Sequence, residues 1–228
     1  MLALLTGPAD GPQADLASRI PARGALWIAT DQEPGAGSDR EVLHRLPWTP
    51  LIALTERLAF PTGTMLSIST LDGFGTTPRR PVVRGDHTDR TAELSRLVRD
   101  GSFPHDLIVL ASLSGLYEDA IGTMSITAGS GSERALEAAR MIAGNAIAHL
   151  CWNLRASGIA TLALCWDIER TMKGKVTGEV VNAPRRIVAM ADVAMRIEQG
   201  RPVVTSAREN SGFSVGQIVT DWTPFLKG

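Results

Sequence analysis

The first residues whose types and spacing could do chemistry are those of GPADGPQA, residues 7–14. They follow an apolar run, Leu2–Leu5, and precede a predicted helix, Gln13–Ile20, which is where a phosphate-binding loop stands in nucleotide-binding proteins. In such a loop, backbone amides surround the phosphates, a lysine neutralises them, and a Ser or Thr hydroxyl holds Mg²⁺. The spacing therefore predicts an anion site, and the residue types decide whether it can work.

The residue types depart from that chemistry. With Gly7 as the first glycine, the second glycine is replaced by Pro12, the lysine by Gln13 and the hydroxyl by Ala14, in a loop whose candidate residues are Gly7, Pro8, Gly11, Pro12, Gln13 and Ala14. Pro12 has no N–H to donate, and Asp10 and Asp15 add negative charge. A hydrogen bond to a charged group contributes roughly 1.5–3 kcal/mol, so losing the lysine, one amide and the Mg²⁺ ligands costs on the order of 5 kcal/mol. That loss weakens a micromolar site to millimolar or beyond.

Composition narrows the remaining chemistry. The 228 residues are 44% hydrophobic and 21% charged, as in ordinary soluble globular proteins, and the net charge of −1 gives no overall attraction to nucleic acid or membrane. The four histidines, His44, His87, His105 and His149, lie far apart, without metal-ligand spacing. We find no membrane span or signal peptide and expect a cytoplasmic protein with Cys151 and Cys165 as buried free thiols.

The elements that position these residues alternate along the chain. Apolar runs predict strands over 2–6, 25–30, 65–70, 106–112 and 159–165, and helical periodicity or capping predicts helices over 13–20, 50–59, 88–100 and 132–158. Three further strands, over 191–197, 202–207 and 215–220, have short connections typical of antiparallel hairpins. Polar stretches at 31–41, 71–87 and 167–186 are predicted to be loops. The pattern predicts a doubly wound, mostly parallel α/β sheet with a C-terminal antiparallel extension.

This order of elements resembles the core of the RecA/RadA recombinases, and four stretches carry the likeness. GPADGPQA resembles the GPxxxGK[ST] loop of that family, and ALWIATDQE resembles its strand that ends in an acidic residue. TAELSRLVRDGSFPHDLIVLASLSGL is similar to the helix and Walker B strand, and ARMIAGNAIAHLCWNLRASGIATLALCWDI is similar to the long helix and the strand that ends at a polar sensor residue.

The resemblance implies a RecA-like P-loop NTPase core. We expect one such domain over residues 1–228, most similar to short single-domain phage RecA-like proteins. Neither the N-terminal segment that links RecA subunits into filaments nor a C-terminal domain is recognised in the sequence.

The resemblance also implies a catalytic set, of which little remains. Ala111 stands where the Walker B aspartate belongs, and Trp166 or Asp167 stands at the sensor position. An acid after the second strand, Asp31 or Glu33, is retained. The loop alone is equally compatible with a turn that never held phosphate, but the joint loss at Ala111 favours a degenerate nucleotide site. We expect no catalytic residue, no metal and no cofactor.

Two loops match those that contact DNA in recombinases, at 117–132 and 169–186. The second carries five basic residues against two acids, Glu169 and Glu179, and its candidate DNA contacts are Arg170, Lys173, Lys175, Arg185 and Arg186. A solvated charged loop is the alternative reading. A further basic cluster, Arg79, Arg80 and Arg84, lies in the 71–87 stretch.

Three functions therefore remain open. The first is a nucleotide-independent DNA-binding or accessory protein in recombination, repair or replication, encoded by a phage. The second is a scaffold or inhibitor that uses a RecA-like fold for protein–protein contact, and a homo-oligomer is included here. The third is a weak ATPase completed by a partner subunit. DNA binding that depends on salt separates the first from the second, and nucleotide titration isolates the third.

Overall fold

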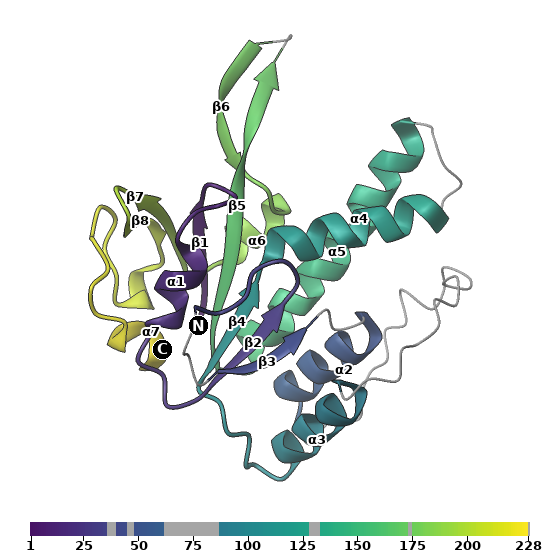
Figure 1. Ribbon diagram of the computed structural model, residues 1–228, viewed down its shortest axis with the longest axis vertical. Helices are drawn as coiled ribbons and strands as arrows, with labels where there is room; N and C mark the ends of the chain where they lie inside the picture. Colours follow the sequence, from purple (N-terminus) through teal and green to yellow (C-terminus); the bar gives the residue numbers. More distant parts are fainter. Residues whose placement is uncertain (36–39, 45–47, 62–86, 128–132, 173–174, 228) are drawn as a thin grey trace.

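The computed structural model of the chain describes residues 1–35, 40–44, 48–61, 87–127, 133–172 and 175–227 (Figure 1). The strands are β1 (Leu2–Gly7), β2 (Ala25–Ala29), β3 (Glu41–His44), β4 (Leu107–Ala111), β5 (Ala160–Met172), β6 (Lys175–Val181), β7 (Val193–Glu198) and β8 (Arg201–Ala207). The helices are α1 (Gln13–Ser18), α2 (Trp48–Ala59), α3 (His87–Arg99), α4 (Leu113–Thr127), α5 (Glu133–Ala156), α6 (Arg185–Met190) and α7 (Thr223–Lys227), with a 3₁₀ turn at Glu209–Ser211.

The eight strands form one sheet in the order β3-β2-β4-β5-β1-β7-β8, with β6 paired to the outer part of β5. All neighbours from β3 to β7 are parallel, whereas β8 runs antiparallel to β7 and β6 antiparallel to β5. The protein is thus an α/β fold with a mostly parallel sheet and an antiparallel edge, which confirms the predicted fold class at that level.

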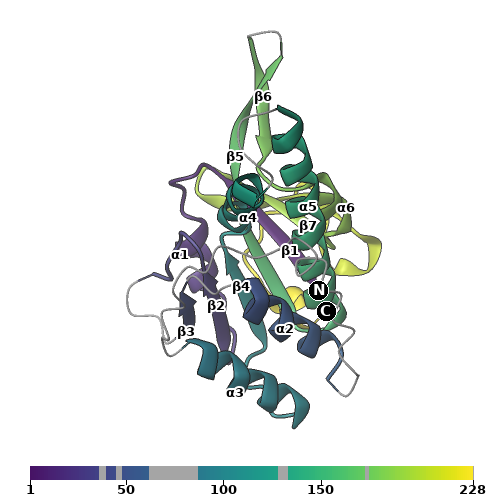
Figure 2. The same ribbon diagram turned by 90° about the vertical axis from the view of Figure 1, so that its right-hand side faces the viewer.

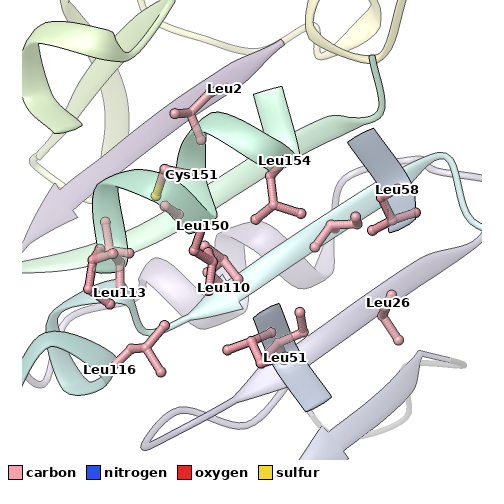
Figure 3. Packing of buried hydrophobic residues seen from close by; sticks show 14 of the residues in the cluster. Leu2, Leu26, Leu51, Leu58, Leu110, Leu113, Leu116, Leu150, Cys151 and Leu154 are labelled. Atoms are coloured by element: carbon pink, nitrogen blue, oxygen red, sulfur yellow. The ribbon is translucent and has the colours of Figure 1, made fainter. Parts of the chain in front are cut away.

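Helices cover both faces of the sheet, as the continuous apolar strands require. On one face, a cluster of buried side chains joins the sheet to α2, α3 and α5, and Figure 3 shows Leu2, Leu110, Leu150 and Leu154 within it. On the other face, a second cluster joins the sheet to α1 and to the C-terminal residues, including Phe225 of α7. Figure 2 shows α1 and α5 on opposite sides of the sheet. Among the described residues, no helix combines the length and apolar character needed to cross a membrane.

Several predicted loops are regular structure instead. Glu41, predicted as the end of a loop, begins β3, a strand that was not predicted, and most of the predicted loop 117–132 belongs to α4. The predicted strand 215–220 makes only an isolated bridge, Val203 to Ile218, although its backbone bonds also cover the edge of β8. In α5, Leu136 is exposed rather than part of the buried stripe. The predicted strand 65–70 and the cluster Arg79, Arg80 and Arg84 lie outside the described residues.

The largest correction concerns the predicted loop 167–186, most of whose described residues lie in strands or a helix. Asp167–Met172 continues β5 and pairs with β6 to form a two-stranded antiparallel ribbon, and residues from Arg185 onward form α6. Figure 1 shows this ribbon projecting away from the rest of the sheet. Val176, Val180 and Val181 favour strand over loop because β-branched side chains suit a pleated backbone. From here on, "the ribbon" means Asp167–Met172 together with Lys175–Val181.

Candidate functional site

The candidate residues from the sequence converge on the carboxyl edge of the parallel sheet, where ligands bind in open α/β sheets. Gly7 at the end of β1 pairs with Trp166 of β5, and Ala29 at the end of β2 pairs with Ala111 at the end of β4. The glycine loop (residues 7–13), the acid after β2, the β4 terminus and the ribbon therefore border one another.

The interior of the glycine loop is filled by the side chain of Gln13. Gln13 is fully buried, and its Nε2 donates hydrogen bonds to the carbonyl oxygens of Pro8 (2.7 Å) and Cys165 (3.3 Å). A Cβ on Gly7 would lie 3.1 Å from Gln13 Nε2, and one on Gly11 would lie 2.4 Å from its Oε1. The residue at the lysine position thus points into the loop and ties it to β5.

The backbone of the loop also closes on itself. The amide of Gly11 donates to the carbonyl of Pro8 at 2.9 Å, and Pro12, which has no N–H, stands immediately before α1. Helix α1 has only six residues and no side-chain cap at its start. Its second residue, Ala14, supplies no hydroxyl. Neither the Gly11 amide nor residue 12 is therefore available as a backbone donor to a phosphate.

Asp31, one of the two predicted vestigial acids, is engaged at the start of α4. Its Oδ1 accepts hydrogen bonds from the Ser112 amide (2.7 Å), the Ser112 hydroxyl (2.8 Å) and the Thr30 hydroxyl (2.8 Å). The Ser112 hydroxyl in turn accepts from the amide of Gly115 at 3.0 Å. A Cβ on Gly115 would lie 2.6 Å from Asp31 Oδ1, so glycine is needed for this approach. A carboxylate at a helix N-terminus is favourable, and Asp31 fixes α4 in place.

The other predicted positions supply no metal-binding carboxylate to this edge. Ala111 is fully buried, and its carbonyl accepts the Thr30 amide at 2.7 Å. Glu33 is exposed and pairs with His44 at 2.9 Å. Within the described ranges, no three His, Cys, Asp or Glu side chains gather as a metal site would require.

At the predicted sensor position, Asp167 belongs to an ion cluster at the foot of the ribbon. Arg196 of β7 donates to Asp167 Oδ2 at 3.0 Å and also contacts Glu179 of β6. Burial raises the pKa of Asp167, Arg196 opposes the increase, and Glu179 adds to it. Arg196 was missed in the sequence because nothing in β7 indicates that it meets the ribbon.

Below the ribbon, the predicted free thiols are confirmed. Cys151 and Cys165 are buried and form no disulfide, and burial raises the pKa of the Cys165 thiol to about 12. Such thiols are protonated and unreactive at neutral pH.

The predicted DNA contacts fall into two groups rather than one. Arg170 and Lys175 are exposed on the ribbon, whereas Arg185 and Arg186 are exposed at the start of α6, where Arg186 bonds to Asn145 of α5 at 2.9 Å. Lys173 lies outside the described residues.

Charge on the ribbon is segregated by face. Neighbouring side chains of a strand point to opposite faces, and paired residues share a face. By that rule Ile168, Arg170 and Val180 share one face, hereafter the basic face. Lys175 lies on the same face through its pairing with Met172, because a register shift between Arg170 and Thr171 reverses the alternation within β6. Asp167, Glu169, Glu179 and Val181 share the other, which is the face that Arg196 approaches. All the acids of the ribbon lie opposite its exposed bases.

No protein-family model matches the sequence, and a search of curated proteins finds no similar sequence. The residues and their arrangement therefore carry the functional argument.

Proposed function

We propose that this protein is a RecA-like core that does not use nucleotide and that binds DNA through the ribbon, as an accessory factor in recombination, repair or replication. The observation that carries the proposal is the Gln13 side chain inside the glycine loop. The strand order, with β5 between the strand of the glycine loop and β4, is compatible with a RecA-like fold.

Nucleotide binding is disfavoured by the hydrogen bonds that Gln13 makes inside the loop. A phosphate entering the loop would have to displace the Gln13 carboxamide from two carbonyl oxygens. It would meet no lysine at position 13 and no Mg²⁺ ligand at Ala14 or Ala111. The charged residue within the loop is Asp10, whose negative charge repels a phosphate. Phosphoryl transfer depends almost wholly on positioning and charge neutralisation, and both are missing.

DNA binding is supported by the basic face. Arg170 and Lys175 are exposed there, whereas the acids Asp167 and Glu179 lie on the opposite face and share an ion pair with Arg196. A projecting ribbon can follow a phosphate backbone without moving the sheet. Because such contacts release counterions, binding is independent of sequence and weakens steeply with salt.

A protein partner is the second candidate, and one observation favours it. Ile168, Val176 and Val180 of the ribbon are 43%, 59% and 38% exposed. Ile168 and Val180 form a cross-strand pair, and exposed apolar side chains on a projecting element are typical of protein–protein contact surfaces.

Fluorescence anisotropy with labelled oligonucleotides at low and physiological salt tests the proposal. We expect the double variant Arg170→Ala/Lys175→Ala to bind all sequences more weakly and to reduce the slope of log affinity against log salt by about two, one for each lost phosphate contact. The matched control is Arg23→Ala/Arg99→Ala, which removes the same charge near the opposite edge of the sheet and should leave the slope unchanged. If the wild type fails to bind at low salt, or the ribbon variant binds equally well, the protein-partner candidate is preferred.

A further inference from the structure

The basic face of the ribbon continues toward the sheet into Trp166. In β5, Leu162 and Leu164 pack into the cluster on the α1 side of the sheet, whereas Ala163 and Cys165 pack into the cluster on the α5 side. Strand alternation therefore places Trp166, Ile168 and Arg170 in one row on the α1 side. Trp166 is only partly buried, next to the glycine loop, and its register partner is Gly7.

We propose that Trp166 is a base-stacking residue: a DNA strand lies along the basic face with its phosphates at Arg170 and Lys175 and an unpaired base against the Trp166 indole. The inference rests on the proposed function and deepens it, because it assigns a site at the foot of the ribbon and a preference for unpaired bases. Every base has a flat face, so stacking of this kind is indifferent to sequence.

The surroundings of Trp166 favour a base over a phosphate at this position. The neighbouring loop carries the exposed Asp10, which repels a phosphate, and the row between Trp166 and Arg170 is filled by the exposed side chain of Ile168. Arg170 lies about 13 Å farther along the strand. The foot of the row is therefore apolar and aromatic, its outer part is basic, and a single strand with bases turned inward matches both.

Duplex DNA cannot make this contact without losing a base pair, since its base faces are already stacked. Single-stranded and duplex DNA can both place phosphates at Arg170 and Lys175. We therefore expect single strands to bind more tightly than duplexes of the same length at the same salt.

The experiment compares fluorescein-labelled oligothymidine with the duplex it forms with oligoadenosine, for the wild type, Trp166→Leu and Trp152→Leu. Trp152 is 47% exposed on α5, across the sheet, and serves as the matched control. We expect Trp166→Leu to lose about tenfold in affinity for the single strand, with little change for the duplex and an unchanged salt slope, because no charge is removed. Trp152→Leu should behave as wild type.

A second measurement holds even if leucine disturbs the fold. Oligothymidine should quench the tryptophan fluorescence of the wild type and of Trp152→Phe but not of Trp166→Phe. Wild-type binding to both DNA forms with equal affinity, or full quenching in Trp166→Phe, overturns the stacking role and leaves the proposed function intact. No wild-type binding to either form overturns both.

Discussion

The glycine loop and the ribbon border the same edge of the sheet and differ in whether their polar side chains are buried or exposed. In the loop, Gln13 bonds to the carbonyls of Pro8 and Cys165, and the Gly11 amide bonds within the loop. On the ribbon, Arg170 and Lys175 are exposed together with Ile168 and Val180. The glycine loop, which has the more familiar sequence pattern, is filled by its own side chain. The ribbon, whose sequence is typical of a charged loop, exposes its side chains to solvent.

A single residue type explains why the loop can close. Glutamine is neutral, so its Nε2 can donate to two buried carbonyl oxygens without bringing a net charge into the loop, although its buried Oε1 has no hydrogen-bond partner among the described residues. A lysine buried in the same place would carry an uncompensated charge. Gly7 and Gly11 have no Cβ, and the space that a Cβ would take at each is occupied by the Gln13 side chain. Glycine spacing alone therefore does not identify a phosphate site.

The largest expected effect tests this closure. In Gly11→Ala the new Cβ would lie 2.4 Å from Gln13 Oε1 and 2.9 Å from the Pro8 carbonyl oxygen, so we expect a loss of about 1–3 kcal/mol in the free energy of unfolding by urea. The matched control is Gly122→Ala, on the exposed face of α4 with no atom near the new Cβ, which should be neutral or stabilising by up to about 1 kcal/mol.

A double variant tests whether contact with Gln13 causes the stability loss of Gly11→Ala. Gln13→Ala removes the nearer of the two contacts, so Gly11→Ala should cost less in the Gln13→Ala background than in the wild type, with a coupling of at least about 0.5 kcal/mol. Additive costs would mean that Gln13 does not fill the loop in solution, and the contrast with the ribbon would fail.

Most of the sheet could be predicted from the sequence because parallel strands buried on both faces must be apolar runs. LALLT, ALWIA and LIVLA have no other stable environment in a chain of this size, and their order with the intervening helices gives the fold class. The predicted loops failed where stability comes from distant partners. Helix α4 is rich in glycine and hydroxyl residues, but its start is fixed by Asp31 from the end of β2.

The candidate site was predicted only in part, for a related reason. That positions 13, 14 and 111 lack a lysine, a hydroxyl and a carboxylate is read directly from the sequence. Where the Gln13 side chain goes does not, since it depends on a carbonyl in β5, more than a hundred residues away. Likewise, counting charges over 169–186 gave a basic segment, but only strand register shows that its acids and bases lie on opposite faces.

A smaller effect is expected at the foot of the ribbon, where the two regions meet. Burial raises the pKa of Asp167 above its ordinary value of 3.8, so the folded state binds a proton more tightly there than the unfolded state. The contribution of this group to stability is therefore greatest below pH 3.8 and decreases as the pH rises through the raised pKa. Asp167→Asn should flatten that part of the profile.

Urea unfolding of the wild type and Asp167→Asn at a series of pH values measures this effect. Asparagine keeps an oxygen that accepts from Arg196, so the fold is preserved. Asp119→Asn, on the exposed surface of α4, controls for the loss of one carboxylate. If Asp167→Asn steepens the profile or leaves it unchanged, the carboxylate is solvated and the ribbon foot is more open than described.

The last prediction is that nucleotide has no effect on the stability of the protein, and it tests the glycine loop most directly. Millimolar ATP with Mg²⁺ should not shift the thermal unfolding midpoint relative to the same ionic strength of NaCl, because Gln13, Ala14 and Ala111 leave neither a cation nor a metal ligand. A stabilisation of several degrees would show a working site, since a ligand well above its Kd raises stability by a few kcal/mol.

Gln13→Lys/Ala14→Thr should not hydrolyse ATP either, because Ala111 still supplies no carboxylate for Mg²⁺. Turnover by that double variant would mean that the metal-binding acid lies on a strand other than β4, and the glycine loop would then be a nucleotide site closed by two substitutions alone.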